Sequence, residues 1–149
     1  AHPKVYDWLL DHPDRASLAW RRMGVPCVGI DATADGRFEW ADGKGSAVAW
    51  RAVGRTPDRV VWYAAGTVKP GLLMPPVPVK AVAVFDAPRT PEGDGTATFA
   101  PTVRVYFQTD NRAAVAALRV AGPAAPRMAD QGAEQLLLFF RGPAGYLLE

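Results

Sequence analysis

Residues 46–67, SAVAWRAVGRTPDRVVWYAAGT, contain two stretches typical of β-strands with a short turn between them. β-Branched and aromatic side chains are frequent in both stretches, and these side chains favour extended backbone. The turn falls at Thr56-Pro57-Asp58, where proline and aspartate are common turn residues. Because parallel strands need a crossover of about a dozen residues or more, so short a connection predicts an antiparallel hairpin.

The same pattern continues on both sides of this hairpin, from residue 25 to residue 108. Turn signals recur at roughly the 8–12-residue spacing of consecutive antiparallel strands. An Asp-Gly pair at residues 35–36 is favoured where a tight hairpin needs positive φ. We therefore predict a six-stranded antiparallel meander, with strands at residues 25–33, 37–41, 46–54, 59–67, 79–87 and 96–108.

Helical periodicity precedes and follows the predicted strands. Residues 3–23 predict two short helices separated at residues 11–13, because proline cannot continue a helix but is favoured in the first turn of the next. After the strands, we predict a helix at about residues 111–121 and a second helix that begins at Pro126. The second carries an apolar stripe that we expect to lie against the concave face of the sheet: Met128, Ala129, Gly132, Ala133, Leu136, Leu137 and Phe140.

Length and composition predict one globular domain over residues 1–149, with 49% apolar and 21% charged residues. No apolar run approaches the ~20 residues of a transmembrane helix. The 17 basic and 15 acidic side chains are spread along the chain, so nucleic acid is not an expected partner. The single cysteine, Cys27, cannot form an internal disulfide, which favours a reducing, cytoplasmic compartment. Because the chain begins at Ala1, we expect that a preceding segment has been removed.

The order of these elements, two helices, six strands and a C-terminal helix, resembles the START and polyketide-cyclase-like helix-grip superfamily. Residues 5–15, VYDWLLDHPDR, followed by Trp20, are similar to its helix pair, in which an apolar helix ends at an Asp-x-Pro-type break. Residues 48–50 and 59–62 are similar to its central strands. The resemblance implies an α+β fold with a curved sheet wrapped around the C-terminal amphipathic helix. Cystatin-like and NTF2-like folds are alternatives.

The sequence contains no recognisable catalytic or metal-binding motif. Its two serines lie outside the sharp strand-to-helix turn of a nucleophile, and His12, one of two histidines, is interpreted as satisfying the helix break. Asp130 and Glu134 share a helical face, but no histidine accompanies them. Residues 43–46, GKGS, lack the upstream glycine and the following helix of a phosphate loop. We assign no catalytic residue, metal or cofactor.

Tryptophan side chains are candidates for a ligand-binding surface, because large rigid apolar groups both build cores and line pockets. We predict that Trp50 and Trp62 line a cavity between the sheet and the last helix, and that Trp20 and Trp50 are largely buried. The small residues at the start of the last helix favour such a cavity, unless the backbones pack closely there.

Residues 102–108 alternate between an apolar set, Val103, Val105 and Phe107, and a polar set, Arg104, Tyr106 and Gln108. If the polar set faces solvent, it implies no function, and we favour this arrangement. A polar set on the concave side would orient a ligand, and Arg104 would then favour a carboxylate or phosphate.

Residues 69–78, KPGLLMPPVP, form a loop, because four prolines and a glycine deny the segment a regular ladder. Exposure of Leu72, Leu73 and Met74 is unfavourable by roughly 1.5–3 kcal/mol each relative to burial, so we expect them to pack on something. They plug the open end of the sheet, cover the mouth of a pocket, or form a contact surface for a partner or a homodimer.

The leading functional hypothesis, implied by the helix-grip resemblance, is non-catalytic binding of a hydrophobic small molecule or lipid between the sheet and the C-terminal helix. The alternative is a cyclase- or hydrolase-type enzyme that uses the same cavity, in which Arg104, Tyr106 or Glu39 would steer acid–base chemistry. A third hypothesis is a structural or interaction domain whose core is filled.

Overall fold

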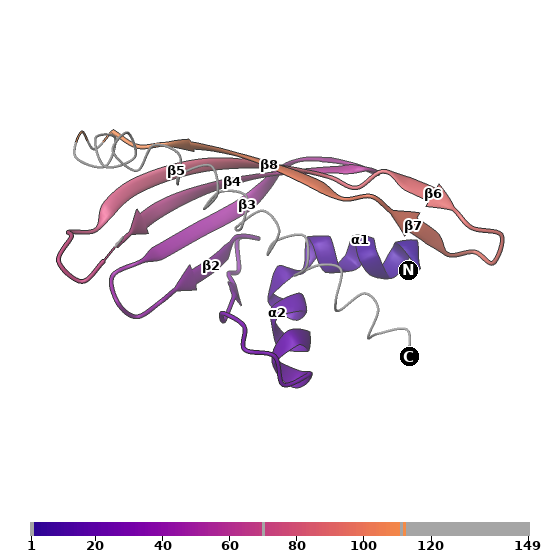
Figure 1. Ribbon diagram of the computed structural model, residues 1–149, viewed down its shortest axis with the longest axis horizontal. Coiled ribbons are helices and arrows are strands. Elements are labelled where there is room, and N and C mark those ends of the chain that lie inside the picture. The colour runs from indigo at the N-terminus through magenta and orange to yellow at the C-terminus, as the bar shows by residue number, and fades with distance from the viewer. Residues whose placement is uncertain (1, 70, 111, 113–149) are drawn as a thin grey trace.

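A computed structural model describes residues 2–69, 71–110 and 112 of the chain (Figure 1). Two helices are followed by eight strands: α1 (Pro3–Asp11), α2 (Pro13–Arg22), β1 (Asp31–Ala32), β2 (Phe38–Ala41), β3 (Ala47–Thr56), β4 (Arg59–Val68), β5 (Val77–Asp86), β6 (Arg89–Pro91), β7 (Ala97–Phe99) and β8 (Thr102–Gln108). The fold is therefore α+β, and both N-terminal helices form where they were predicted. The helices predicted after residue 110, and the wrapping of the sheet around the last of them, lie outside the described residues.

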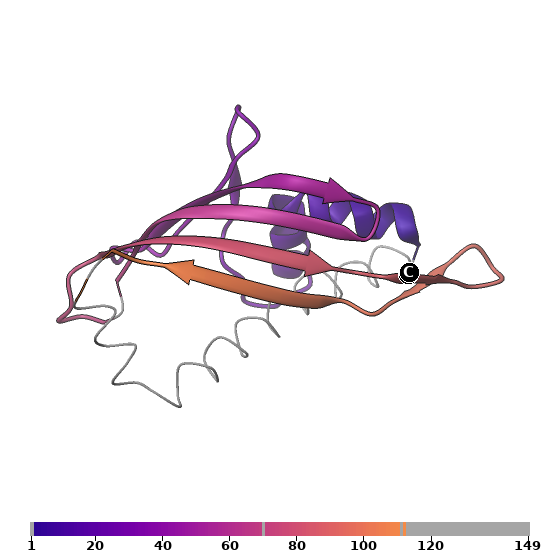
Figure 2. The same ribbon diagram turned by 90° about the horizontal axis from the view of Figure 1, so that it is seen from above.

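Six of the strands form one antiparallel sheet in the order β1-β2-β3-β4-β5-β8. Each strand pairs with the next along the chain, except that a two-stranded ribbon of β6 and β7 is inserted between β5 and β8. The sheet arches over α1 and α2, which lie on its concave side (Figure 1). The predicted six-stranded antiparallel meander is confirmed, and Figure 2 shows its long strands from above.

The first and last strand predictions were too long. Residues 25–30 are not a strand, because Pro26 offers no amide hydrogen and Gly29 favours other conformations, so β1 has only two residues. Residues 96–108 divide into β7 and β8 at Pro101 for the same reason. The connection predicted at residues 88–95 contains β6, which pairs with β7.

The core lies where α1 and α2 pack on the concave side of β4 and β5. Tyr6, Leu9 and Leu10 form the apolar face of α1 and are buried against the sheet. The other buried members of this core are Ala16, Val60, Trp62, Phe85 and Ala87. Burial of these side chains supplies most of the favourable free energy of folding in this part of the chain.

The tryptophans differ in how far they are buried, and neither Trp20 nor Trp50 is an exposed residue. Trp62 is the buried tryptophan, with 6% of its surface exposed. Trp50 is only partly buried and packs at the margin of the core, and Trp20 is also partly buried. Trp50 sits one row of the sheet farther from the helices than Trp62, since its cross-strand partner is Ala64.

Candidate functional site

The register of the central strands assigns every side chain to one of two faces. Trp62 on β4 pairs with Ala52 on β3 and with Ala83 on β5. Ala83 in turn pairs with Val105 on β8. Because Trp62 is buried beside α1 and side chains alternate along a strand, this row and every second residue from it face the concave side.

Two further concave rows follow in the direction of the β4–β5 hairpin. The first row contains Phe38, Trp50, Ala64, Ala81 and Phe107, and the second contains Trp40, Val48, Gly66 and Val79. The middle strands supply mostly small side chains, Ala64, Ala81 and Gly66 with Val79 as the exception, whereas the flanking strands supply mostly large ones. We call Ala64, Gly66 and Ala81 the central strip.

Aromatic side chains stand on both sides of the central strip. On β2 and β3, the rings of Phe38 and Trp50 have centroids 6.0 Å apart at an interplanar angle of 35°. On β8, the ring of Phe107 stands on the same face and is mostly exposed. The concave surface next to the core is therefore low in the middle and walled by aromatic groups.

Gly66 keeps the middle of this surface low because no larger residue fits there. A Cβ at this position would lie 2.1 Å from the carbonyl oxygen of Ala47 and 2.8 Å from Cα of Val48. The backbone of β3 thus lies directly against Gly66, which is the kind of close approach that requires glycine.

The concave rows carry almost no ionisable groups. Among the described residues of β2, β3, β4, β5 and β8, only Arg55 is ionisable and faces this side. The others face the opposite side: Glu39, Arg51, Arg59, Tyr63, Lys80, Asp86, Arg104 and Tyr106. The concave surface can therefore contact apolar groups but offers little for acid–base chemistry.

Two arginines on the opposite face share one carboxylate partner, Asp86. Asp86 accepts hydrogen bonds from Nε of Arg59 at 2.5 Å and from Nη2 of Arg104 at 3.1 Å. The Arg59 guanidinium first, and then Arg104, lowers the pKa of the Asp86 carboxyl. Arg104 is thus engaged by a carboxylate of the protein itself, on the face away from the helices.

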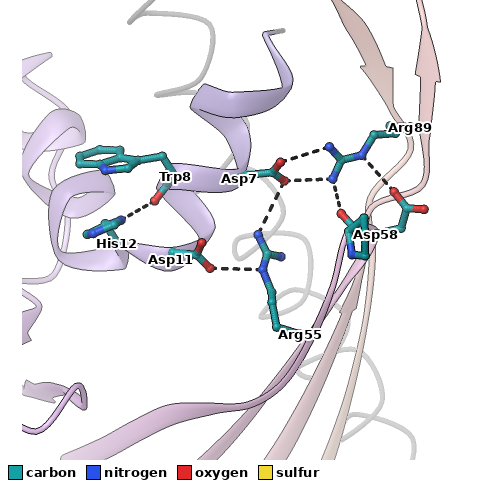
Figure 3. Close-up of polar contacts among 8 residues, drawn as sticks. Asp7, Trp8, Asp11, His12, Arg55, Asp58 and Arg89 are labelled. Atoms are coloured by element: carbon teal, nitrogen blue, oxygen red, sulfur yellow. Dashed lines mark hydrogen bonds and ion pairs between the residues drawn. The ribbon is translucent and has the colours of Figure 1, made fainter.

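Arg55 reaches the helix side because β3 contains a bulge between Ala52 and Gly54. After the bulge, Arg55 pairs with Val60, which belongs to the core. Its Nε lies 3.3 Å from Oδ1 of Asp11, and its Nη2 lies 3.6 Å from Oδ1 of Asp7 (Figure 3). The bulge therefore turns a cation toward two carboxylates of α1.

Arg89, on β6, completes this ion-pair cluster. Its Nη1 and Nη2 donate to the two carboxylate oxygens of Asp7 at 3.1 and 3.0 Å, and its Nε donates to Asp58 at 3.0 Å (Figure 3). A further hydrogen bond joins Arg89 to the carbonyl oxygen of Pro57. Asp7, and secondarily Asp58, raises the pKa of the Arg89 guanidinium. These contacts join α1 to the β6–β7 ribbon and to the β3–β4 turn.

His12 has the local role that the sequence indicated. Its Nδ1 lies 2.8 Å from the carbonyl oxygen of Trp8, and the two rings stack with centroids 4.5 Å apart (Figure 3). The ring therefore provides a hydrogen-bond partner for a backbone carbonyl in the last turn of α1, at the break before Pro13.

The structure separates the predicted site residues into three groups. Trp50 and Trp62 share the concave face, although Trp62 is buried under the helices. The polar set Arg104, Tyr106 and Gln108 lies on the opposite face, so the alternative that placed it on the concave side is wrong. Leu73 and Met74 lie in the β4–β5 connection, apart from both groups.

Leu72, Leu73 and Met74 do not plug the sheet. Leu72 is 90% exposed, Leu73 is 100% exposed and Met74 is 37% exposed. The prediction that they plug the open end of the sheet is wrong because β4 and β5 pair as far as Val68 and Val77, whereas β8 ends at the pair of Lys80 with Gln108. The hairpin thus projects beyond its neighbour on β8, where little of the sheet is left to cover its tip. A pocket cover and a contact surface for a partner stay predictions.

Sequence reasoning missed the central strip and the ion-pair cluster. Alanines and glycine at alternate positions of residues 64–66 and 81–83 are a signal for a low concave surface, but only once the register of β4 and β5 is known. Asp7 and Arg89 are 82 residues apart, and nothing local to either residue indicates the other.

Comparison with known proteins adds no relative: the chain matches no family model, no curated protein and no solved structure. The helix-grip resemblance therefore stays a prediction. Within the described residues, no group of three or more His, Cys, Asp or Glu side chains could hold a metal ion. Neither α1 nor α2 has the length and apolar character that a membrane-crossing helix needs.

Proposed function

We propose that this protein binds a hydrophobic small molecule or lipid on the concave face of its sheet, over the central strip. The observation that carries the proposal is the composition of that face. In the rows beyond the core, the described residues are all apolar or glycine, mostly small in the middle and mostly aromatic at the sides. Ligand pockets are typically apolar with few polar groups, and apolar area removed from water contributes roughly 25 cal/mol per Å².

The dimensions of the strip suit a narrow ligand. Neighbouring strands lie about 4.8 Å apart, so β3 and β8 are separated by roughly 14 Å across β4 and β5. Between the aromatic walls this leaves room for one acyl chain or one fused ring system lying on Ala64 and Ala81. The predicted apolar stripe around Leu136 would then cover the ligand from the other side.

An enzyme of the cyclase or hydrolase kind is the less favoured alternative. The polar residues suggested for such chemistry, Arg104, Tyr106 and Glu39, lie on the opposite face. Proton transfer requires a donor or acceptor within hydrogen-bond reach of the ligand, and the concave rows of the described strands supply none beside the central strip.

A pair of neighbouring alanines gives a matched test. Ala64 faces the central strip, and Ala65 faces the opposite side of the same strand. We expect Ala64→Phe to weaken binding of the fluorescent fatty acid cis-parinaric acid by about tenfold or more, because the added ring occupies the ligand's space. Ala65→Phe should bind like the unmodified protein.

Native mass spectrometry of the purified protein provides the second measurement. An additional mass that is present in the unmodified protein and in Ala65→Phe, but lost in Ala64→Phe, supports the proposal. If no adduct is seen and the unmodified protein does not bind cis-parinaric acid, the concave face is filled and the third hypothesis, a structural or interaction domain, replaces this one.

A further inference from the structure

The tip of the β4–β5 hairpin exposes two leucines to an extent that no other large apolar residue reaches within the described chain. Leu72 is 90% exposed and Leu73 is 100% exposed, and we call them the tip leucines. A hydrogen bond of 3.3 Å from the amide of Met74 to the carbonyl oxygen of Gly71 closes a turn around them. Pro75 and Pro76 follow at once and restrict the returning backbone. The turn therefore presents the tip leucines outward.

Two lysines lie at the base of this tip. The amide of Lys69 donates to the buried hydroxyl of Ser46 at 3.0 Å, which joins the hairpin to the β2–β3 turn. The side chain of Lys69 lies over Gly45, where a Cβ would be only 2.9 Å from its Cδ. Lys44 is the residue before Gly45, so both ammonium groups belong to the same end of the sheet.

The acidic groups at this end do not neutralise the lysines directly. One carboxylate oxygen of Asp42 accepts hydrogen bonds from the backbone amides of Lys44 at 2.7 Å and Ser46 at 3.0 Å. These amides lower the pKa of the Asp42 carboxyl. Asp110, after the end of β8, is a second carboxylate among the described residues at this end of the sheet. Among the described residues, neither Lys44 nor Lys69 forms an ion pair.

The opposite end of the molecule, at the β6–β7 turn, carries acidic side chains in place of lysines. The β6–β7 turn, at the other end of the long axis from the β4–β5 hairpin, carries the exposed residues Glu92 and Asp94 (Figures 1 and 2). An anionic surface would therefore attract the end that carries the tip leucines and repel the end that carries Glu92 and Asp94.

We propose that the hairpin tip docks on an anionic lipid bilayer, with Leu72 and Leu73 inserted at the level of the head groups and Lys44 and Lys69 against the lipid phosphates. Apolar side chains beside basic ones are the combination by which proteins bind to bilayer surfaces without crossing them. A second copy of this chain fits the tip less well. A stable protein interface buries about 800 Å² on each partner, which two side chains on a narrow projection do not supply.

Vesicle sedimentation tests the proposal with the full chain. We expect the protein to sediment with phosphatidylcholine vesicles that contain phosphatidylserine, and less with phosphatidylcholine alone or at high salt. The double variant Leu72→Ser/Leu73→Ser should lower the partition coefficient by about tenfold. Val28→Ser/Val53→Ser removes two other exposed apolar side chains and should leave it unchanged.

Charge reversal tests the contribution of the lysines. Lys44→Glu/Lys69→Glu should abolish the preference for phosphatidylserine, whereas Lys4→Glu/Arg15→Glu, on α1 and α2, should retain it. The tip leucines make no buried contact, so the Leu72→Ser/Leu73→Ser variant should keep the melting temperature of the unmodified protein. A shared melting temperature assigns any loss of sedimentation to the tip itself.

The proposal is overturned if the unmodified protein sediments with neither kind of vesicle, or if Leu72→Ser/Leu73→Ser sediments as well as the unmodified protein. It is also overturned if these substitutions abolish self-association in solution while vesicle binding is absent, because the occupant of the tip is then a second copy. Binding of cis-parinaric acid depends on the concave face and not on the tip leucines. Loss of vesicle binding without loss of this probe therefore separates the two proposals.

Discussion

Asp7 and Arg89 lie 82 residues apart in the sequence and form a bidentate ion pair, with nitrogen–oxygen distances of 3.1 and 3.0 Å. Asp7 belongs to α1, and Arg89 belongs to the β6–β7 ribbon outside the main sheet. The pair thus joins α1 to the β6–β7 ribbon. Arg55 and Asp58 extend it from the β3–β4 hairpin.

This geometry predicts that Arg89→Lys is destabilising although it preserves the charge. An ammonium cannot reproduce the paired hydrogen bonds of a guanidinium, so we expect the free energy of unfolding to fall by about 1 kcal/mol. Asp7→Asn should cost more, because Arg55 and Arg89 then both lose a charged partner. Urea denaturation measures both changes. Arg37→Lys, in the exposed pair with Asp35, is the control and should change little.

The cluster also shows where local sequence reasoning ends. The break between α1 and α2 was predictable because Pro13 acts within its own turn. The strands of the central hairpin were predictable because their composition and their turn are local. The Asp7–Arg89 pair and the central strip depend on which strands become neighbours and in what register, and that is set by packing across the whole sheet.

The tip leucines illustrate the complementary failure. The cost of exposing Leu72 and Leu73 predicted that they pack, and the structure leaves them in solvent. The cost of exposure favours packing in a loop that lies on the sheet, but this hairpin extends past the end of β8. A sequence does not show how far one hairpin extends past its neighbouring strand, so it could not decide between a plug and an exposed contact surface.

Gly66→Ala should be among the most damaging single-methyl additions in the described sheet. The new Cβ would lie 2.1 Å from a backbone oxygen of β3, so the two strands must move apart. We expect a loss of about 3 kcal/mol in the free energy of unfolding. Gly54→Ala is the matched control, since its Cβ meets only the Val61 side chain at 3.5 Å, an ordinary contact. Equal melting temperatures for the two variants would contradict the close approach at Gly66.

The β1–β2 turn makes a prediction about pH. The hydroxyl of Thr33 donates to Asp35, and this hydrogen bond, with the Arg37 side chain, lowers the pKa of the Asp35 carboxyl to about 2. Because the pKa of Asp35 is lower in the folded state, its ionised carboxylate stabilises the folded turn at pH values above the ordinary pKa of 3.8. This contribution is lost as the pH falls toward 2. Thr33→Val should raise the pKa of Asp35 toward 3.8.

Carboxyl NMR resonances followed through an acid titration measure this shift directly. Thr98→Val, which removes a hydroxyl bonded to Glu92 in the β6–β7 ribbon, is the control. It should leave the Asp35 titration where it is. An Asp35 resonance that titrates near 3.8 in the unmodified protein would show that the Thr33 contact does not persist in solution.

The predicted stripe on the last helix can be tested without assuming a ligand. If Leu136 packs against the concave rows, Leu136→Ala should lower the free energy of unfolding by about 2–5 kcal/mol, as removal of buried leucine carbons usually does. Gln135→Ala, its sequence neighbour on the predicted polar face, should change the same quantity by less than about 0.5 kcal/mol. Acrylamide quenching gives a second measurement, because Trp50 is only partly buried among the described residues. A covering helix protects the Trp50 indole, and Leu136→Ala should therefore increase the quenching of Trp50.

If Leu136→Ala and Gln135→Ala unfold at the same urea concentration, the helix does not cover the central strip, and the proposed ligand site loses its second wall.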